Sequence, residues 1–230
     1  MFIELAEVLV CPVCLPRQAE GTLQGLVAVV GEVHDRNVIS GWLGCPSCEA
    51  RYPIRDGAVC FAPAPPEPRD RSGGEPAATE PPPGSSGPQA EAALLVAALL
   101  SLHDGAEYVL LGQGLGARAE ELSRLAPASE IVALQRWEEG PVSQPTAGVT
   151  RLSDTPEGSL PLRAASMTAA VILGAGEVVV AETARVLRPA GRLAVLGSSP
   201  SREEAILSLL RTAGLDPIVV DPRAIVAQRV

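Results

Sequence analysis

The chain has 230 residues, which is enough to bury a hydrophobic core and to form one or two domains. Its 47% hydrophobic and 20% charged residues are typical of soluble globular proteins, and its net charge of −9 excludes a broad nucleic-acid-binding surface. The longest apolar run (92–102) has 11 residues, fewer than the ~20 needed to cross a bilayer. The N-terminal segment lacks the features of a secretory signal peptide, so we expect a cytoplasmic protein with reduced cysteines.

Two CPxC pairs lie near the start of the chain, Cys11 with Cys14 and Cys45 with Cys48. Each short turn presents two sulfurs to one ion, and four thiolates in this spacing are typical of tetrahedral zinc. Such a set leaves no open coordination position, so the sequence predicts a structural zinc site. A redox CxxC pair or disulfides are the alternatives, although a redox motif needs only one such pair, at the start of a helix.

The segment 41–61, GWLGCPSCEARYPIRDGAVCF, extends the pattern beyond metal spacing. Over residues 3–62 the chain resembles the zinc-ribbon family that activates methyltransferases acting on tRNA, rRNA and release factors. The residues that match its YPIxDGIP-like segment are Tyr52, Pro53, Ile54, Asp56 and Gly57. Ala58 and Val59 replace the usual Ile-Pro. The resemblance implies a ribbon that stabilises a methyltransferase partner, in part by adding a strand to the partner's sheet.

Residues 62–89 are rich in proline and glycine and contain no large apolar side chain. Such a composition cannot offset the entropy lost on ordering, so it predicts a flexible linker or, as an alternative, a proline-rich recognition ligand. We therefore expect a zinc-ribbon domain at 1–61, a linker at 62–89 and a second domain at 90–230.

In the second domain, short apolar runs alternate with helical patterns. The predicted strands are 107–111, 130–134, 148–152, 169–173, 192–197, 217–220 and 224–229. The predicted helices are 90–102, 116–126, 177–187 and 202–213. This alternation predicts an α/β fold, a Rossmann-like, mainly parallel sheet with helices on both faces.

A glycine loop follows the first of these strands, in the segment VLLGQGLG at 109–116. This loop resembles the GxGxG loop of class I S-adenosylmethionine (SAM) methyltransferases. The segment 181–197, AETARVLRPAGRLAVLG, is similar to the family's E-x-x-RVLxPGGxL pattern, with Ala190 in place of the first glycine. The resemblance covers about 105–230 and implies a class I methyltransferase-like domain.

The resemblance also implies a cofactor site at the loop. Gly112, Gly114 and Gly116 would let the backbone approach SAM, and the following helix N-terminus would face its carboxylate. An acid at position 110 would bind the SAM ammonium, but the chain has Leu110 there.

A second acid, at the end of the second strand, would bind the ribose hydroxyls, and Gln135 occupies that position. Loss of two charge-assisted hydrogen bonds, at about 1.5–3 kcal/mol each, would lower the affinity by roughly 10²–10⁴. Gln135 could restore a neutral hydrogen bond to ribose, and Asp154 lies where the family places an acid near adenine. We therefore expect SAM binding that is weak or lost, and a loop retained for tight packing is an equal alternative.

The function expected from these features is non-catalytic, because no methyl-acceptor motif follows the fourth strand. The chain is interpreted as a binding or scaffold protein that supports a protein partner, namely a methyltransferase or its substrate complex. An active fused SAM methyltransferase with an atypical site is the alternative. A weaker one is an NADP-binding Rossmann protein, because Gly112, Gly114 and Ala117 also fit GxGxxA and Arg136 could meet a 2′-phosphate.

Overall fold

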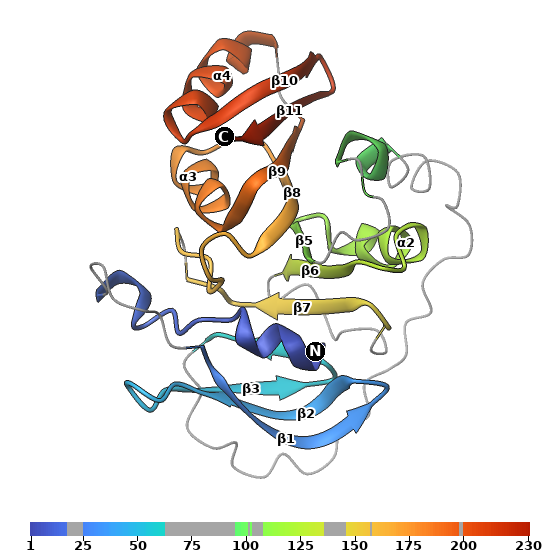
Figure 1. The fold of residues 1–230 in the computed structure, drawn as a ribbon, viewed down its shortest axis with the longest axis vertical. Helices are drawn as coiled ribbons and strands as arrows, with labels where there is room; N and C mark the ends of the chain where they lie inside the picture. Colours follow the sequence, from blue (N-terminus) through green and yellow to red (C-terminus); the bar gives the residue numbers. More distant parts are fainter. Residues whose placement is uncertain are drawn as a thin grey trace, which may run out of the picture.

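In the computed structural model, the strands form one 11-stranded sheet in the order β1-β2-β3-β4-β7-β6-β5-β8-β9-β11-β10 (Figure 1). The structure describes residues 1–17, 25–62, 95–100, 102, 108–135, 146–156, 158–197 and 200–230. The predicted linker lies outside these residues except for Ala62.

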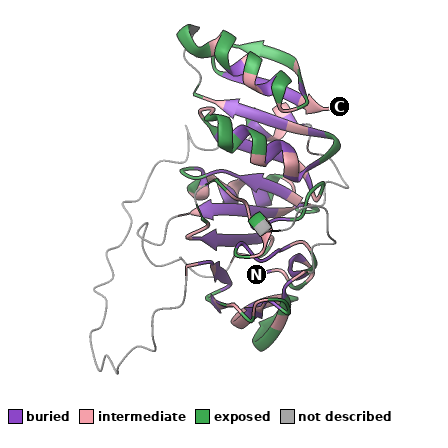
Figure 2. Cartoon of the chain, turned by 90° about the vertical axis from the view of Figure 1, so that its left-hand side faces the viewer, coloured by how far each residue is buried: buried purple, intermediate pink, exposed green. Residues whose placement is uncertain are grey.

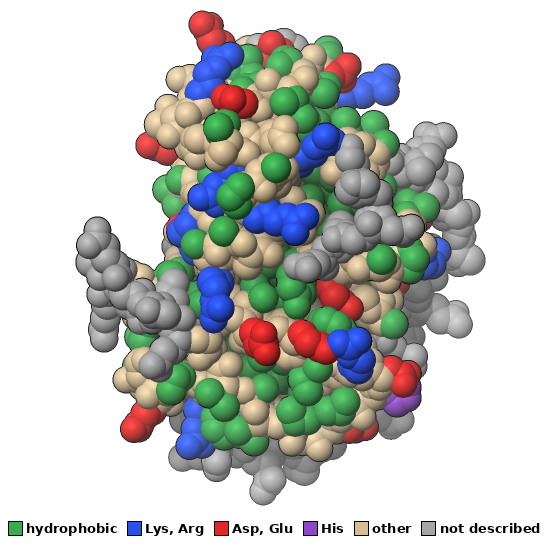
Figure 3. Space-filling view, viewed as in Figure 1, with side chains coloured by type: hydrophobic (Ala, Val, Ile, Leu, Met, Phe, Trp, Pro, Cys, Tyr) green, Lys and Arg blue, Asp and Glu red, His purple; other side chains and the backbone are tan. Residues whose placement is uncertain are grey.

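The N-terminal part supplies four antiparallel strands and short 3-10 turns. The strands are β1 (Val27–His34), β2 (Asn37–Gly44), β3 (Arg51–Arg55) and β4 (Ala58–Cys60), and the turns are η1 (Ile3–Glu7) and η2 (Leu15–Arg17). Asp56 and Gly57 connect β3 to β4 with φ of 50° and 76°, as a tight hairpin turn requires. β1 is the outermost strand, and Figure 3 shows hydrophobic side chains at the surface over these ribbon strands.

The second part forms the doubly wound sheet expected from the sequence. Its strands are β5 (Tyr108–Leu111), β6 (Glu130–Gln135), β7 (Val149–Ser153), β8 (Met167–Leu173), β9 (Leu187–Leu196), β10 (Leu215–Asp221) and β11 (Ala224–Arg229). Strands β5 to β9 pair in parallel, and β11 and β10 close that edge as an antiparallel hairpin. The predicted α/β fold class with a mainly parallel sheet is confirmed.

Strand β9 begins earlier than the predicted 192–197, because its first residues pair with β8 before a register shift. Ala190 lies in this irregular stretch with a φ of 62°, in the left-handed region that glycine prefers. Gly191 follows it, and a Cβ there would lie 2.8 Å from the Arg188 carbonyl oxygen and 3.0 Å from that of Thr168. Both positions of the family's two glycines therefore favour glycine in this backbone. Gly191 meets this requirement, whereas Ala190 adopts the left-handed conformation with strain.

Helices cover both faces of the sheet, and the central strands are buried between them (Figure 2). The remaining elements are η3 (Gly116–Arg118), α2 (Ala119–Leu125), α3 (Glu177–Val186), η5 (Pro200–Arg202) and α4 (Glu203–Thr212). The helical residues 95–100 and α2 pack on one face, against Val109 and Ile131. On the other face, α3 and α4 pack against Ile172 and Val195. No helix among the described residues is long and apolar enough to span a membrane.

The ribbon is joined to the second part through the sheet itself. β4 pairs in parallel with β7, and Val59 lies opposite Leu152. A second contact lies outside the sheet, where Val10 N donates to Pro161 O (3.0 Å) and Arg163 N donates to Val8 O (2.8 Å). The buried side chains on both sides belong to one cluster, including Leu9, Leu43, Phe61, Leu152 and Leu162. The two predicted domains therefore share one sheet and one hydrophobic core.

Candidate functional site

The four predicted zinc ligands come together. Cys11, Cys14, Cys45 and Cys48 place their sulfurs within 4.8 Å of one another. The Sγ atoms of Cys11 and Cys48 are 3.6 Å apart, and those of Cys14 and Cys45 are 3.7 Å apart. Four sulfurs at 2.3 Å from a central zinc would be ~3.8 Å apart at each tetrahedral edge. The residues fit zinc, and a complete set of four protein ligands gives the ion a structural role.

The surroundings of the sulfurs differ from one side of the cluster to the other. Burial and neighbouring thiols raise the pKa of Cys14 to about 12, and burial also raises that of Cys11. At Cys45, burial acts to raise the pKa, but backbone N–H groups of Cys48 and Ser47 outweigh it and lower the pKa to about 7. Because zinc binds thiolates, metal uptake must displace protons from Cys11 and Cys14, whose pKa values are raised.

Tyr52, which matches the family segment, contacts the cluster directly. Its hydroxyl lies 3.0 Å from Cys11 Sγ, and its ring packs against Phe61 at a centroid distance of 5.0 Å. The same side chain therefore holds a zinc ligand in place and fills the core next to β4. The CPxC spacing of the cysteines does not point to Tyr52, but the family's YPI segment does.

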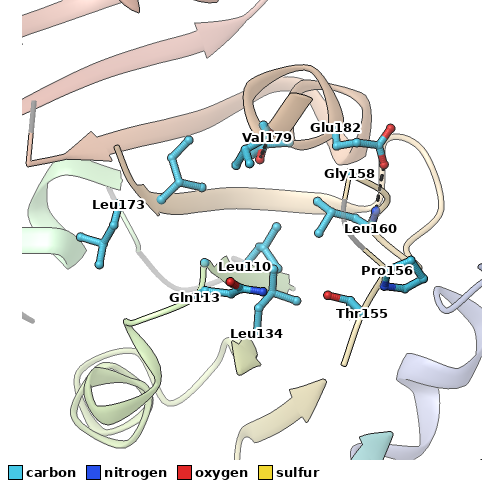
Figure 4. A pocket seen from close by; sticks show the side chains of 13 residues that line it. Leu110, Gln113, Leu134, Thr155, Pro156, Gly158, Leu160, Leu173, Val179 and Glu182 are labelled. Carbon is cyan, nitrogen blue, oxygen red and sulfur yellow. Dashed lines mark hydrogen bonds between the residues drawn. The ribbon is translucent and has the colours of Figure 1, made fainter. Parts of the chain in front are cut away.

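A cavity of about 360 Å³ lies at the carboxyl edge of β5, β6 and β8. In a doubly wound sheet, ligands bind at the point where the strand order reverses, and here that point lies between β5 and β8. The lining residues are Leu110, Gly112, Gln113, Leu134, Thr155, Pro156, Gly158, Leu160, Ile172, Leu173, Val179, Glu182 and Thr183. Most of these side chains are aliphatic, and they approach from the strand ends, from α3 and from the segment after β7 (Figure 4).

The cavity carries one acidic side chain among its described lining residues, and that acid is already paired. Glu182 Oε2 accepts hydrogen bonds from Leu160 N (2.9 Å) and from Arg185 Nη2 (2.9 Å). Arg185 also donates to the carbonyl oxygens of Leu160 and Leu162, each at 2.9 Å. This pair was not singled out from the sequence as a functional pair, although both residues belong to the E-x-x-R portion of 181–197. The pair ties α3 to the backbone of Leu160 and Leu162 in the segment after β7.

The glycine loop follows β5 with a different requirement at each glycine. A Cβ on Gly112 would lie 3.1 Å from the Val171 carbonyl oxygen, so close approach to β8 favours glycine there. Gly114 has a φ of 79°, whereas a Cβ at Gly116 would meet nothing within 4 Å. The predicted helix 116–126 begins as the 3-10 turn η3, and α2 has only seven residues. Of the three glycines, Gly112 lines the cavity.

The positions expected to carry acids lie around the same edge. Leu110 is fully buried and lines the cavity floor, next to Leu134. Gln135 ends β6 opposite Ser153, and Asp154 follows β7 with its carboxylate 3.6 Å from the Cys60 thiol. Neither Gln135 nor Asp154 is a lining residue, so their cofactor contacts remain predictions. Arg136, the residue of the NADP alternative, lies outside the described residues.

Comparison with protein families gives one match. The model described as Trm112p-like protein matches residues 3–57, which contain the four cysteines. No curated protein sequence matches the chain significantly.

Solved structures similar to the chain include the cyclase SpnF, the pyocyanin biosynthetic protein PhzM and a SAM-dependent O-methyltransferase from Thermotoga maritima. Their sequence identities are 22%, 17% and 15%, and their TM-scores are 0.44, 0.49 and 0.48. The matches cover 56%, 60% and 61% of this chain and 58%, 54% and 65% of those structures, so the chain spans less than two thirds of each. The chain thus joins a Trm112p-like zinc-ribbon region to an α/β part whose structural neighbours include SAM-dependent methyltransferases.

Proposed function

We propose that the protein is a non-catalytic binding or scaffold module with a degenerate SAM site. In this proposal, the ribbon covers the β7 edge of its own methyltransferase-like part rather than that of a separate chain. The assembled unit supports a protein partner, a methyltransferase or its substrate complex. The exposed valines of the outer ribbon strand leave apolar surface for that contact; they are Val27, Val29, Val30 and Val33.

The observation that carries the proposal is Leu110. This side chain is fully buried on the cavity floor, where the SAM ammonium would need an acid. An ammonium group placed there loses its hydration without gaining an anionic partner, which is strongly unfavourable. The opposite end of the site is weak as well, because the turns before α2 already use the N–H groups of Leu115 and Arg118 for bonds to Gly112 O and Leu115 O.

Calorimetric titration with SAM tests the proposal. We expect a dissociation constant weaker than high micromolar and little thermal stabilisation by millimolar SAM. A ligand at a hundred times its dissociation constant would stabilise the fold by ~2.7 kcal/mol, which is readily detected. Low-micromolar affinity would refute the non-catalytic proposal.

Restoring the acids provides a second test. The double variant Leu110→Asp with Gln135→Asp is expected to increase the response to SAM. Val109→Asp is the matched control, since Val109 is equally buried but belongs to the cluster on the opposite face of β5. An equal response in the control would show that the effect is not local to the cavity.

An active fused SAM methyltransferase is the second candidate function, and the cavity itself favours it. A volume of about 360 Å³ at the switch point lies within the range of small-molecule sites. Methyl transfer from labelled SAM to any acceptor in a cell extract, lost in a variant with a blocked cavity, would support this candidate.

A further inference from the structure

The walls of the cavity have a consistent chemical character. Among the described lining residues, aliphatic side chains come from β5, β6, β8, α3 and the segment after β7. They are Leu110, Leu134, Leu160, Ile172, Leu173 and Val179. Figure 4 shows those that it labels, all but Ile172, around one shared space. A ligand in this space exchanges water for hydrocarbon over most of its surface.

The charged side chain in the cavity wall is already paired with a cation of the same chain. Glu182 is the one charged residue among the described lining residues, and Arg185 donates to both of its carboxylate oxygens at 3.0 and 2.9 Å. Leu160 N donates to the same carboxylate. A charged ligand group would therefore have to compete with this arrangement or enter the cavity without a partner, and both are costly.

Neutral hydrogen-bonding groups remain at one side of the cavity. Gln113 presents an amide and Thr155 a hydroxyl there (Figure 4). Both groups can donate and accept, so together they suit a neutral edge that contains donors and acceptors. Thr183 has a smaller role, because its hydroxyl donates to Val179 O at 2.7 Å.

We propose that the cavity binds an uncharged small molecule with an apolar body and one hydrogen-bonding edge, in preference to charged ligands such as SAM. This inference rests on the proposed function and names the ligand class of the same site. It reverses the selectivity of a methyl-donor site, since the donor carries a sulfonium, an ammonium and a carboxylate.

A set of three related probes tests the selectivity by calorimetry. 5′-Methylthioadenosine is uncharged, S-adenosylhomocysteine adds the amino-acid zwitterion, and SAM adds the sulfonium as well. We expect 5′-methylthioadenosine to bind at least about tenfold more tightly than either charged probe, because each unpaired charge forfeits a charge-assisted hydrogen bond.

Two neighbouring substitutions locate the binding. Val179→Trp places a large ring into the cavity from α3, and Val178→Trp is its matched control, because Val178 is similarly exposed but does not line the cavity. Val179→Trp is expected to weaken binding of the neutral probe at least about tenfold, and Val178→Trp is expected to leave it unchanged. Circular dichroism verifies that both variants fold.

The outcomes separate this inference from the proposed function. If the parent chain prefers the neutral probe, and Val179→Trp weakens that binding while Val178→Trp does not, the result supports both the inference and the proposed function. No binding of any probe overturns the inference and leaves the non-catalytic function standing. SAM that binds as tightly as the neutral probe, or more tightly, overturns the inference, and low-micromolar SAM affinity overturns the function as well.

Discussion

Replacing one zinc ligand should destabilise the whole chain and not only the ribbon. Cys45→Ser removes one of four sulfurs that lie within 4.8 Å of one another. Structural zinc in small modules contributes roughly 10–16 kcal/mol, which exceeds the stability of most domains. We therefore expect the variant to lose its zinc and the ribbon to unfold.

The effect on the second part follows from the shared core. When the ribbon unfolds, Leu152 and Leu162 lose the side chains that cover them, and both are fully buried in the intact chain. Exposure of two leucines costs about 3–6 kcal/mol. At roughly 2–4 °C per kcal/mol for a domain of this size, the melting temperature of the second part should fall by at least ~6 °C.

Elemental analysis and differential scanning calorimetry measure the two steps separately. The parent chain should carry one zinc per molecule. Cys60→Ser is the matched control, because Cys60 lies beside Asp154 and not in the cluster, so the control should keep its zinc.

Two results would refute the reasoning. Full zinc content in Cys45→Ser would show that the cluster is not the metal site. Loss of zinc with an unchanged melting transition of the second part would show that the common sheet and core do not couple the two parts energetically.

Four further predictions concern single features. Ala190→Gly should raise the free energy of unfolding by about 0.5–1 kcal/mol in urea titrations, because relief of the 62° φ exceeds the added chain entropy; a less stable variant would contradict this. Tyr52→Phe removes the hydroxyl 3.0 Å from Cys11 Sγ and should weaken zinc binding about tenfold in chelator competition, whereas unchanged affinity would exclude a role for that hydroxyl. Burial raises the pKa of Glu130 above its usual 4.5, so the folded state favours the protonated carboxyl. The stability that this protonated form contributes is lost as pH rises through the folded-state pKa. Glu130→Gln should therefore be more stable than the parent chain at pH 7, with a smaller difference at pH 4, and equal stability at pH 7 would argue against this. Brief digestion with a broad-specificity protease should cut within 62–89, and resistance throughout would contradict the composition-based linker.

The features predicted well from the sequence are those set by local patterns. The two CPxC pairs specify the sulfur cluster because each turn is short, and the predicted strands recur in the structure because apolar runs mark buried strands. The predicted strand 192–197 lies largely within β9, but its earlier start at Leu187, with Ala190 and Gly191 in the irregular stretch, was not predicted.

The features that were missed depend on contacts between distant residues. Pairing of β4 with β7 brings Val59 next to Leu152, and no local pattern specifies that register, although the family resemblance indicated strand addition to a partner. The pairing of Glu182 with Arg185 is visible as i,i+3 spacing, but its contact with the Leu160 segment is not. The start of α2 at residue 119 depends on how the glycine loop turns, which propensities do not fix.

The pairing of β4 with β7 also changes the kinetics of docking. In the family that the ribbon resembles, activator and methyltransferase are separate molecules, so their association depends on concentration. Here both strands belong to one chain, so docking is unimolecular and the ratio of the two parts is fixed at one to one. A free ribbon would therefore have to exceed the effective concentration of the attached one to displace it. A ribbon tied in this way cannot be shared among several methyltransferases through its β4 edge while that edge is paired.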